Sequence, residues 1–242
     1  MTNERFFMGM PQNFQNICEV YPPTIRQTRE NKFFPHYRQL LTVSYEELDD
    51  KWFDEKIKTP VPTPFQYLMS FCQNEPQLEE LGKHAFEFFI HEPVTFMYDL
   101  NCICIGDLEQ EILRINDPKQ LRFINEDNYF DFQNLCREAI GEKAVEPPRL
   151  DEDPRIKRIK RLGRKRDRIA SKNKGIDFGT TLAAICCMGL GLNPLNIGEI
   201  SICAMYTLIA MYQGKEKYEI DIRSLQAGAD AKKIKPEYWI KN

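Results

Sequence analysis

A block of positive charge constrains the fold of this chain more than any other feature of its sequence. Residues 155–174 contain eleven lysines and arginines and a single acid, Asp167, so the segment carries a net charge of +10. The other 22 basic and 35 acidic residues sum to −13. Because a charge that is buried without a partner loses its hydration, we expect this segment to lie at the surface.

The basic segment also predicts how the chain is divided. Residues 1–145 are expected to form a helical domain with one small β-hairpin at about 94–105. Residues 146–175 are expected to form a linker, first rich in proline and acids and then basic. Residues 176–242 are expected to form a small helical domain. The fold class predicted from this pattern is mainly α.

The residues leave the conformation and the role of the basic segment open. A thin apolar stripe at Ile156, Ile159 and Leu162 allows a helix, whereas a flexible chain is the alternative. The segment could be a solvated connector, or it could contact nucleic acid through salt-dependent phosphate contacts. It lacks aromatic residues that would stack on bases. An acidic protein partner or an anionic membrane surface is a further alternative.

Local signals predict several element boundaries in the N-terminal part. Thr24, Ser44 and Thr63 are expected to cap helices, the last with Pro64 at the first helical position. Residues 94–98 and 102–105 are rich in β-forming side chains and predict a hairpin with a three-residue loop. Residues 1–16 show no periodicity and are expected to be an arm or tail. A helical stretch is expected from about Asp107 through Leu108, Ile112 and Leu113, and a further helix over 130–140, ending at Gly141.

The apolar run from Phe178 to Gly198 contains no charged residue. Asn193-Pro194 interrupts it with a turn signal, so we expect one short helix, a turn and the start of a second helix. We therefore expect no membrane insertion. The eight cysteines are expected to be reduced thiols, because the N-terminus has no secretory signal.

The sequence gives little support for catalysis or metal binding. The three histidines do not form a metal-binding motif, and no Cys-x-x-Cys spacing occurs. No sequence pattern indicates a nucleophile next to a general base and a third group that orients the base. We therefore expect no catalytic residues, no metal, no cofactor and no enzymatic activity.

The C-terminal segment resembles a known family in its run of motifs. These motifs are Leu182–Gly198, Glu216–Asp221, Ala227–Lys233 and Tyr238-Trp239, with Tyr21–Thr24 and Phe86–Glu92 matching in the N-terminal part. Together they resemble the tail assembly chaperones of long-tailed bacteriophages, particularly those of Gram-positive hosts. The resemblance covers most of the chain from about residue 17.

The resemblance implies a protein that binds the tape measure protein, keeps it soluble and helps to recruit tail tube subunits. It implies action in the host cell cytoplasm and absence from the mature virion. Some members exist in a short and a frameshift-extended form, and the basic segment looks like the join of an extended product. Self-association is a further possibility, and nucleic-acid binding through residues 155–174 is the alternative function. The family contributes no catalytic residues. The residues expected to bind partners are Phe86, Phe89, Arg155, Lys157, Arg158, Lys160, Arg161, Arg164, Lys165, Arg166, Met205, Tyr206, Tyr212 and Trp239.

Overall fold

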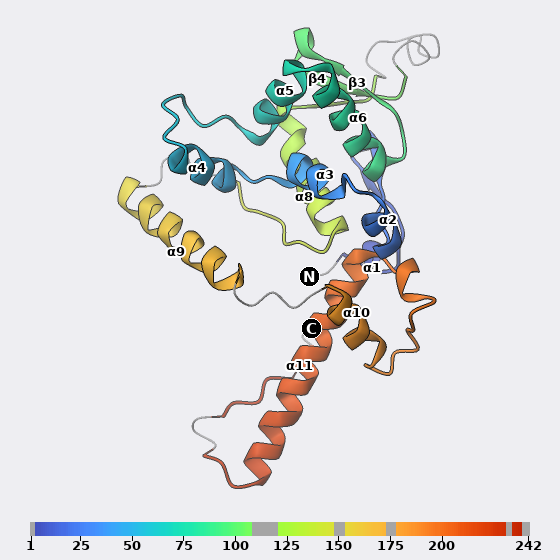
Figure 1. The fold of residues 1–242 in the computed structure, drawn as a ribbon, viewed down its shortest axis with the longest axis vertical. Helices are drawn as coiled ribbons and strands as arrows, with labels where there is room; N and C mark the ends of the chain where they lie inside the picture. The colour runs from blue at the N-terminus through green and yellow to red at the C-terminus, as the bar shows by residue number, and fades with distance from the viewer. Residues whose placement is uncertain (1–2, 108–120, 148–152, 173–177, 231–233, 239–242) are drawn as a thin grey trace.

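The computed structural model of the chain is mainly α-helical, as predicted, with two small antiparallel sheets (Figure 1). The structure describes residues 3–107, 121–147, 153–172, 178–230 and 234–238. The predicted helical stretch through Leu108, Ile112 and Leu113 lies outside these residues. The helices are α1 (Glu4–Phe7), α2 (Ile25–Glu30), α3 (Phe34–Thr42), α4 (Tyr45–Asp54), α5 (Pro64–Asn74), α6 (Pro76–Ile90), α8 (Glu126–Ala139), α9 (Pro154–Lys172), α10 (Phe178–Cys186) and α11 (Ile202–Gln226).

Reciprocal capping explains where three of these helices begin. The side chains of Thr24, Ser44 and Thr63 each accept a hydrogen bond from a backbone N–H three residues later. The side chain at that later position bonds back to the N–H of the capping residue, which satisfies two otherwise unpaired donors. The three predicted caps are therefore confirmed.

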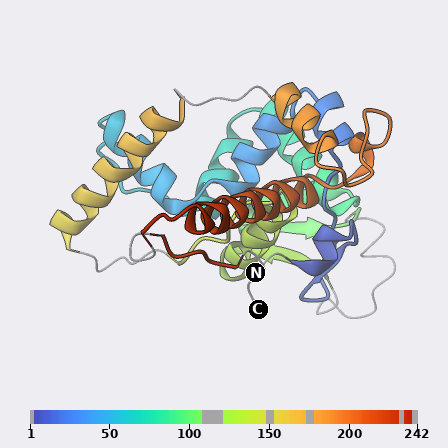
Figure 2. The ribbon, with the colours of Figure 1, turned by 90° about the horizontal axis from the view of Figure 1, so that it is seen from below.

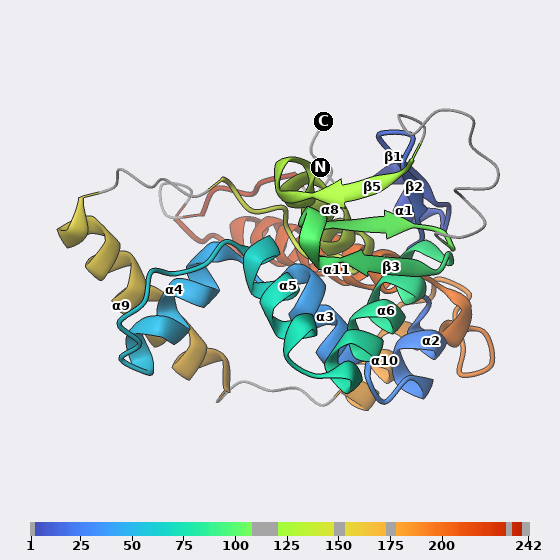
Figure 3. The ribbon, with the colours of Figure 1, turned by 90° about the horizontal axis from the view of Figure 1, so that it is seen from above.

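The larger sheet has the order β3 (Val94–Met97), β4 (Cys102–Ile105) and β5 (Phe123–Asn125), all antiparallel (Figure 3). The predicted hairpin is confirmed, although Met97 pairs with Cys102, so the loop has four residues instead of three. The strand β5 was not predicted. Phe96, Ile103 and Ile124 stand in register on the face that packs inward.

The core of the molecule is aromatic and lies between this sheet and helices α5, α6 and α8. The ring of Phe86 stacks on Phe132 with centroids 5.4 Å apart and planes at 7°, and it meets Phe96 edge-on at 6.1 Å. Tyr129 packs against Phe65 at 5.2 Å in the same cluster. Burial of these large side chains supplies the main driving force for folding of this part.

The expectation that residues 1–16 form an arm or tail is wrong. Residues 4–7 form the short helix α1, and β1 (Gln12–Phe14) pairs with β2 (Cys18–Val20) in a tight hairpin. Phe6 and Phe14 are buried in the main core and anchor both pieces. Each piece is too short to show a hydrophobic periodicity in the sequence. Its conformation depends instead on the burial of these two side chains in the core.

The start of α11 is tied to the N-terminal part of the chain. The N–H of Ile202 donates to the carbonyl of Pro23 at 2.9 Å, and the N–H of Ile25 donates to that of Ile200 at 3.0 Å. The hydroxyl of Ser201 donates to the carbonyl of Phe6 at 2.9 Å. Residues from both predicted domains thus share one core in this conformation. Independent folding of residues 176–242 as a domain stays a prediction.

The apolar run forms a short helix, a turn and the start of a second helix, as the sequence predicts. Helix α10 ends at Cys186, and Gly189 and Gly191 both adopt positive φ in the turn that follows. A 3-10 turn, η3 (Ile197–Glu199), leads into α11. Figure 2 shows α9 and α10 at opposite sides of the molecule with α11 crossing between them.

Gly141 stops α8, as predicted, and permits close contact with α11. Its φ is +77°, and an added Cβ would lie 2.9 Å from Cδ2 of Tyr206 and 3.3 Å from Cα of Cys203. We expect Gly141→Ala to lower the free energy of unfolding by about 3 kcal/mol, since backbone strain and steric overlap add. Urea denaturation measures this loss.

The matched control for this substitution is Gly228→Ala at the end of α11. Gly228 has φ +92°, but nothing lies within 4 Å of an added Cβ. Only backbone strain then applies, and the loss is expected to be about 1 kcal/mol. Equal losses at the two glycines would show that the contact between Gly141 and α11 contributes nothing.

Candidate functional site

The basic segment forms the helix α9, which lies beside α4 at the edge of the molecule (Figures 1 and 3). Four of its cations, Lys157, Arg161, Arg164 and Lys165, recur at the spacing that places side chains on one side of a helix. This inner face contacts four carboxylates of α4, those of Glu46, Asp49, Asp50 and Asp54. Two oppositely charged helices therefore face each other.

Arg164 and Asp50 form the central ion pair between the two helices. Nε of Arg164 donates to Oδ2 of Asp50 at 3.0 Å, and Nη2 donates to Oδ1 at 2.7 Å. The Asp50 side chain is only 2% exposed, and its hydrogen bonds raise the pKa of Arg164 above the ordinary value. This two-bonded geometry is the strongest form of an arginine–carboxylate contact.

Asp49 is the second buried carboxylate between the helices. Nη2 of Arg161 donates to its Oδ2 at 2.5 Å, and Nζ of Lys157 lies 3.3 Å from Oδ1. Aromatic side chains of α4 add cation–π contacts, because the guanidinium of Arg161 lies 4.1 Å above the ring of Phe53 and the ammonium of Lys157 lies 5.6 Å from that of Tyr45.

The opposite face of α9 has a different composition. Ile156, Ile159 and Leu162 are 49%, 69% and 59% exposed. Four further cations, Arg155, Arg158, Lys160 and Arg166, are exposed on the same helix. The structure thus divides the eight basic residues predicted to bind partners into four that contact α4, of which Lys165 is also exposed, and four others at the surface.

Three aromatic or apolar residues predicted to bind partners are buried instead. Phe86, Phe89 and Met205 are 0% exposed and belong to the main core. A partner that docks on this conformation therefore does not reach them, because they fill the space between helices and sheet. Any role for them in binding stays a prediction that requires the core to open.

Tyr206 and Tyr212 lie on α11, and Trp239 lies outside the described residues. Tyr206 is 46% exposed and lines a hollow of about 500 Å³ with Glu138, Lys143 and Cys203, between the end of α8 and the start of α11. Tyr212 is half-buried. Helix α11 extends away from the body of the molecule (Figure 1). Met211 and Ile220 are exposed on this helix.

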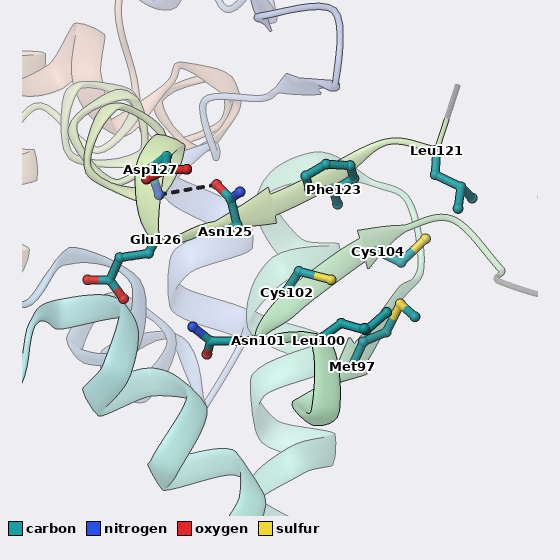
Figure 4. A pocket seen from close by; sticks show the side chains of 10 residues that line it. All are labelled: Met97, Leu100, Asn101, Cys102, Cys104, Leu121, Phe123, Asn125, Glu126 and Asp127. Carbon is teal, nitrogen blue, oxygen red and sulfur yellow. Dashed lines mark hydrogen bonds between the residues drawn. The ribbon is translucent and has the colours of Figure 1, made fainter. Parts of the chain in front are cut away.

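A hollow on the outer face of the larger sheet was missed by sequence reasoning. It has a volume of about 480 Å³ and is lined mainly by apolar and thiol groups, including Met97, Cys102 and Phe123 (Figure 4). Burial raises the pKa of Cys102. At its rim, Oε2 of Glu126 is buried without a hydrogen-bond partner among the described residues. The alternation of Cys102 and Cys104 was the one signal that both thiols share a face.

The described residues contain no group of three or more His, Cys, Asp or Glu side chains placed to hold a metal ion. All eight cysteines carry thiols instead of disulfides. Desolvation by burial raises the pKa values of Cys18 and Cys72 to about 12, which makes both thiols poor nucleophiles. His91 stacks on Tyr21 with ring centroids 4.2 Å apart, and burial lowers its pKa. The absence of catalysis stays an expectation.

The C-terminal part of the chain matches a known domain family. Residues 170–242 match the family model of the YomV second domain. This is a phage-associated domain family, so the chain carries a phage-associated domain at its C-terminal end. The match begins within α9 and includes α10 and α11. No curated protein and no solved structure matched the chain. Within the described part of the chain, no helix combines the length and apolar character needed to cross a bilayer.

Proposed function

We propose that the chain is a non-enzymatic bacteriophage tail assembly chaperone, which binds the tape measure protein and helps to recruit tail tube subunits. The proposal is supported by the sequence resemblance and by the phage-associated domain at residues 170–242. In this proposal the chain acts in the host cell cytoplasm and does not enter the mature virion.

The proposal depends on the length and the exposed surface of helix α11. It has 25 residues, lies within the matched segment and extends from the body of the molecule (Figure 1). Exposed Tyr206 and Ile220 are spaced so that they lie on the same side of the helix, where they provide apolar surface. Its rise corresponds to about 38 Å, enough for several turns of a client helix to lie against it.

Co-expression with the tape measure protein from the same genome tests the proposal. We expect a larger soluble fraction of that client and its co-purification with the chain. Ile220→Glu is expected to reduce co-purification at least ~10-fold, because a carboxylate replaces an apolar contact at the interface. The Ile220 side chain is exposed, so the fold should tolerate the change.

Leu195→Glu is the matched control for the α11 variant. Leu195 is 87% exposed and lies in the same matched segment, in the turn that precedes α11. It should leave co-purification unchanged. An unaltered soluble fraction without co-purification contradicts the function, whereas equal losses in both variants contradict the assignment to α11.

Nucleic-acid binding is the second candidate function, favoured by the exposed cations of α9. The ion pairs to α4 weaken this candidate, because each cation held by a carboxylate is less able to neutralise a phosphate. Salt-sensitive binding of a duplex, lost when the exposed arginines are replaced, would support it over the chaperone function.

A further inference from the structure

The outer face of α9 is a narrow ridge that no described element covers. The outer ridge, as we define it, consists of Arg155, Ile156, Arg158, Ile159, Leu162 and Arg166. Its three aliphatic side chains recur every three residues and are about half exposed or more. Exposed aliphatic stripes on a helix are typical of surfaces that bind another protein.

Helix α4 fixes the orientation of this ridge. The contacts of Arg161 and Arg164 with Asp49 and Asp50 hold the inner face of α9 against α4. Rotation of α9 about its axis would break these contacts, because both carboxylates are buried and have fixed positions. The outer ridge is therefore presented to solvent as a pre-organised surface.

The charge of the ridge defines what it can bind. On the inner face, four cations contact four carboxylates of α4. Within the described part of the chain, Arg155, Arg158 and Arg166 take part in no such pair across to α4. The ridge thus combines a positive surface with an aliphatic stripe.

We propose that the outer ridge of α9 docks an acidic amphipathic helix of a partner protein. Such a helix carries aliphatic residues every three or four positions, which pack on Ile156, Ile159 and Leu162. Aspartates and glutamates on its flanks pair with the arginines of the ridge. Complementary charge steers the encounter, and apolar contact at the centre of the interface holds the complex.

The shape and surroundings of the ridge favour a single helix over larger anionic partners. A DNA duplex offers phosphates but no apolar surface that matches three aliphatic side chains. A bilayer is a broad anionic sheet, and it would approach the acidic remainder of the chain together with α9. One helix is narrow enough to contact the ridge alone.

This proposal concerns a surface separate from α11 and does not require the chain to be a tail chaperone. Its test uses a synthetic peptide instead of the tape measure protein. Failure of the peptide to bind would leave the co-expression experiment unaffected, and failure of co-expression would leave the peptide experiment unaffected.

The probe is a fluorescent 18-residue peptide with leucine at alternating three- and four-residue spacing and glutamate at most other positions. We expect saturable binding to the full chain in anisotropy measurements, weakened by added salt. A peptide of the same composition with its leucines spread around the helix should bind at least ~10-fold more weakly. This control separates a specific apolar stripe from general attraction between opposite charges.

Two matched triple variants test the two parts of the ridge. Ile156→Gln, Ile159→Gln and Leu162→Gln remove the stripe, and Arg155→Gln, Arg158→Gln and Arg166→Gln remove the charge. The first set should weaken peptide binding at least ~10-fold with the salt dependence kept, and the second should weaken it and reduce the salt dependence. Because all six side chains are exposed, circular dichroism should show unchanged helix content.

Three outcomes would overturn the proposal. The first is peptide binding that is the same in the stripe variant and in the unmodified chain. The second is absence of peptide binding at low salt. The third is tighter binding to a 20-base-pair duplex, or to vesicles containing phosphatidylserine, with loss in the arginine variant, which would assign the ridge to nucleic acid or to an anionic membrane.

Discussion

Replacing Phe86 with alanine is expected to lower the free energy of unfolding by about 4 kcal/mol, the typical cost of removing a fully buried phenylalanine. Phe86 is 0% exposed, and its ring lies between those of Phe132 and Phe96. The truncation removes both aromatic contacts and leaves a cavity that the sheet and α8 cannot close without moving. Chemical denaturation with urea or guanidinium measures the loss.

The matched control for this substitution is Phe33→Ala. Phe33 is 56% exposed, and its ring stacks on that of Tyr37 with centroids 6.4 Å apart. Its removal should cost less than about 1 kcal/mol. A small loss at Phe86 together with a large loss of client binding would contradict its place in the core and support the original prediction that it binds a partner.

Replacing Asp50 with asparagine is expected to release α9 from α4 and to cost about 3 kcal/mol, the range seen when one member of a buried ion pair is removed. Arg164 then loses both charge-assisted hydrogen bonds to this carboxylate. An isolated helix of this length is marginally stable in water, so α9 should also lose helical structure. Hydrogen exchange of the α9 amides measures the release directly.

Glu46→Gln is the control for this second prediction, because Glu46 pairs with the same arginine. Its side chain is 58% exposed, and its carboxylate lies 3.3 Å from Nη1 of Arg164. Solvent screens this pair, so the cost should be below about 1 kcal/mol and α9 should stay protected. Protection of α9 that is equally high in the Asp50 variant would show that the two helices are held by other contacts.

The two predictions separate the two kinds of contact that hold this molecule together. The aromatic core around Phe86 depends on apolar burial and should respond little to salt. The α4–α9 contact depends on ion pairs, some at the edge of the interface, and should weaken as salt concentration rises. The outer ridge needs the second contact, because α4 sets its orientation.

Local signals in the sequence were sufficient for much of the secondary structure. The caps at Thr24, Ser44 and Thr63 and the hairpin around residues 94–105 were predicted because each depends on residues close together in the chain. The start of α8 was missed by four residues, since Asn125 caps this helix with Asn128 instead of a glutamate or glutamine. Strand β5 and the short pieces at residues 4–14 were missed because they carry too few residues to show a period.

The candidate site was predicted only in part. The sequence identified the basic residues of α9 and required them to lie at the surface, because their charge cannot be buried without partners. It could not show that Arg161 meets Asp49, which is 112 residues away along the chain. It also could not show that Phe86, Phe89 and Met205 face inward, because a helix in a protein with several layers can be apolar on more than one side.

What the sequence determined by itself was local: where helices begin and end, where the hairpin turns, and that residues 155–174 are too charged for a core. The tertiary structure alone decided which cations of α9 contact α4 and which remain exposed. The physical reason is that ion-pair partners and burial depend on contacts between segments distant in the chain, whereas caps, turns and periodicity depend on neighbours within a few residues.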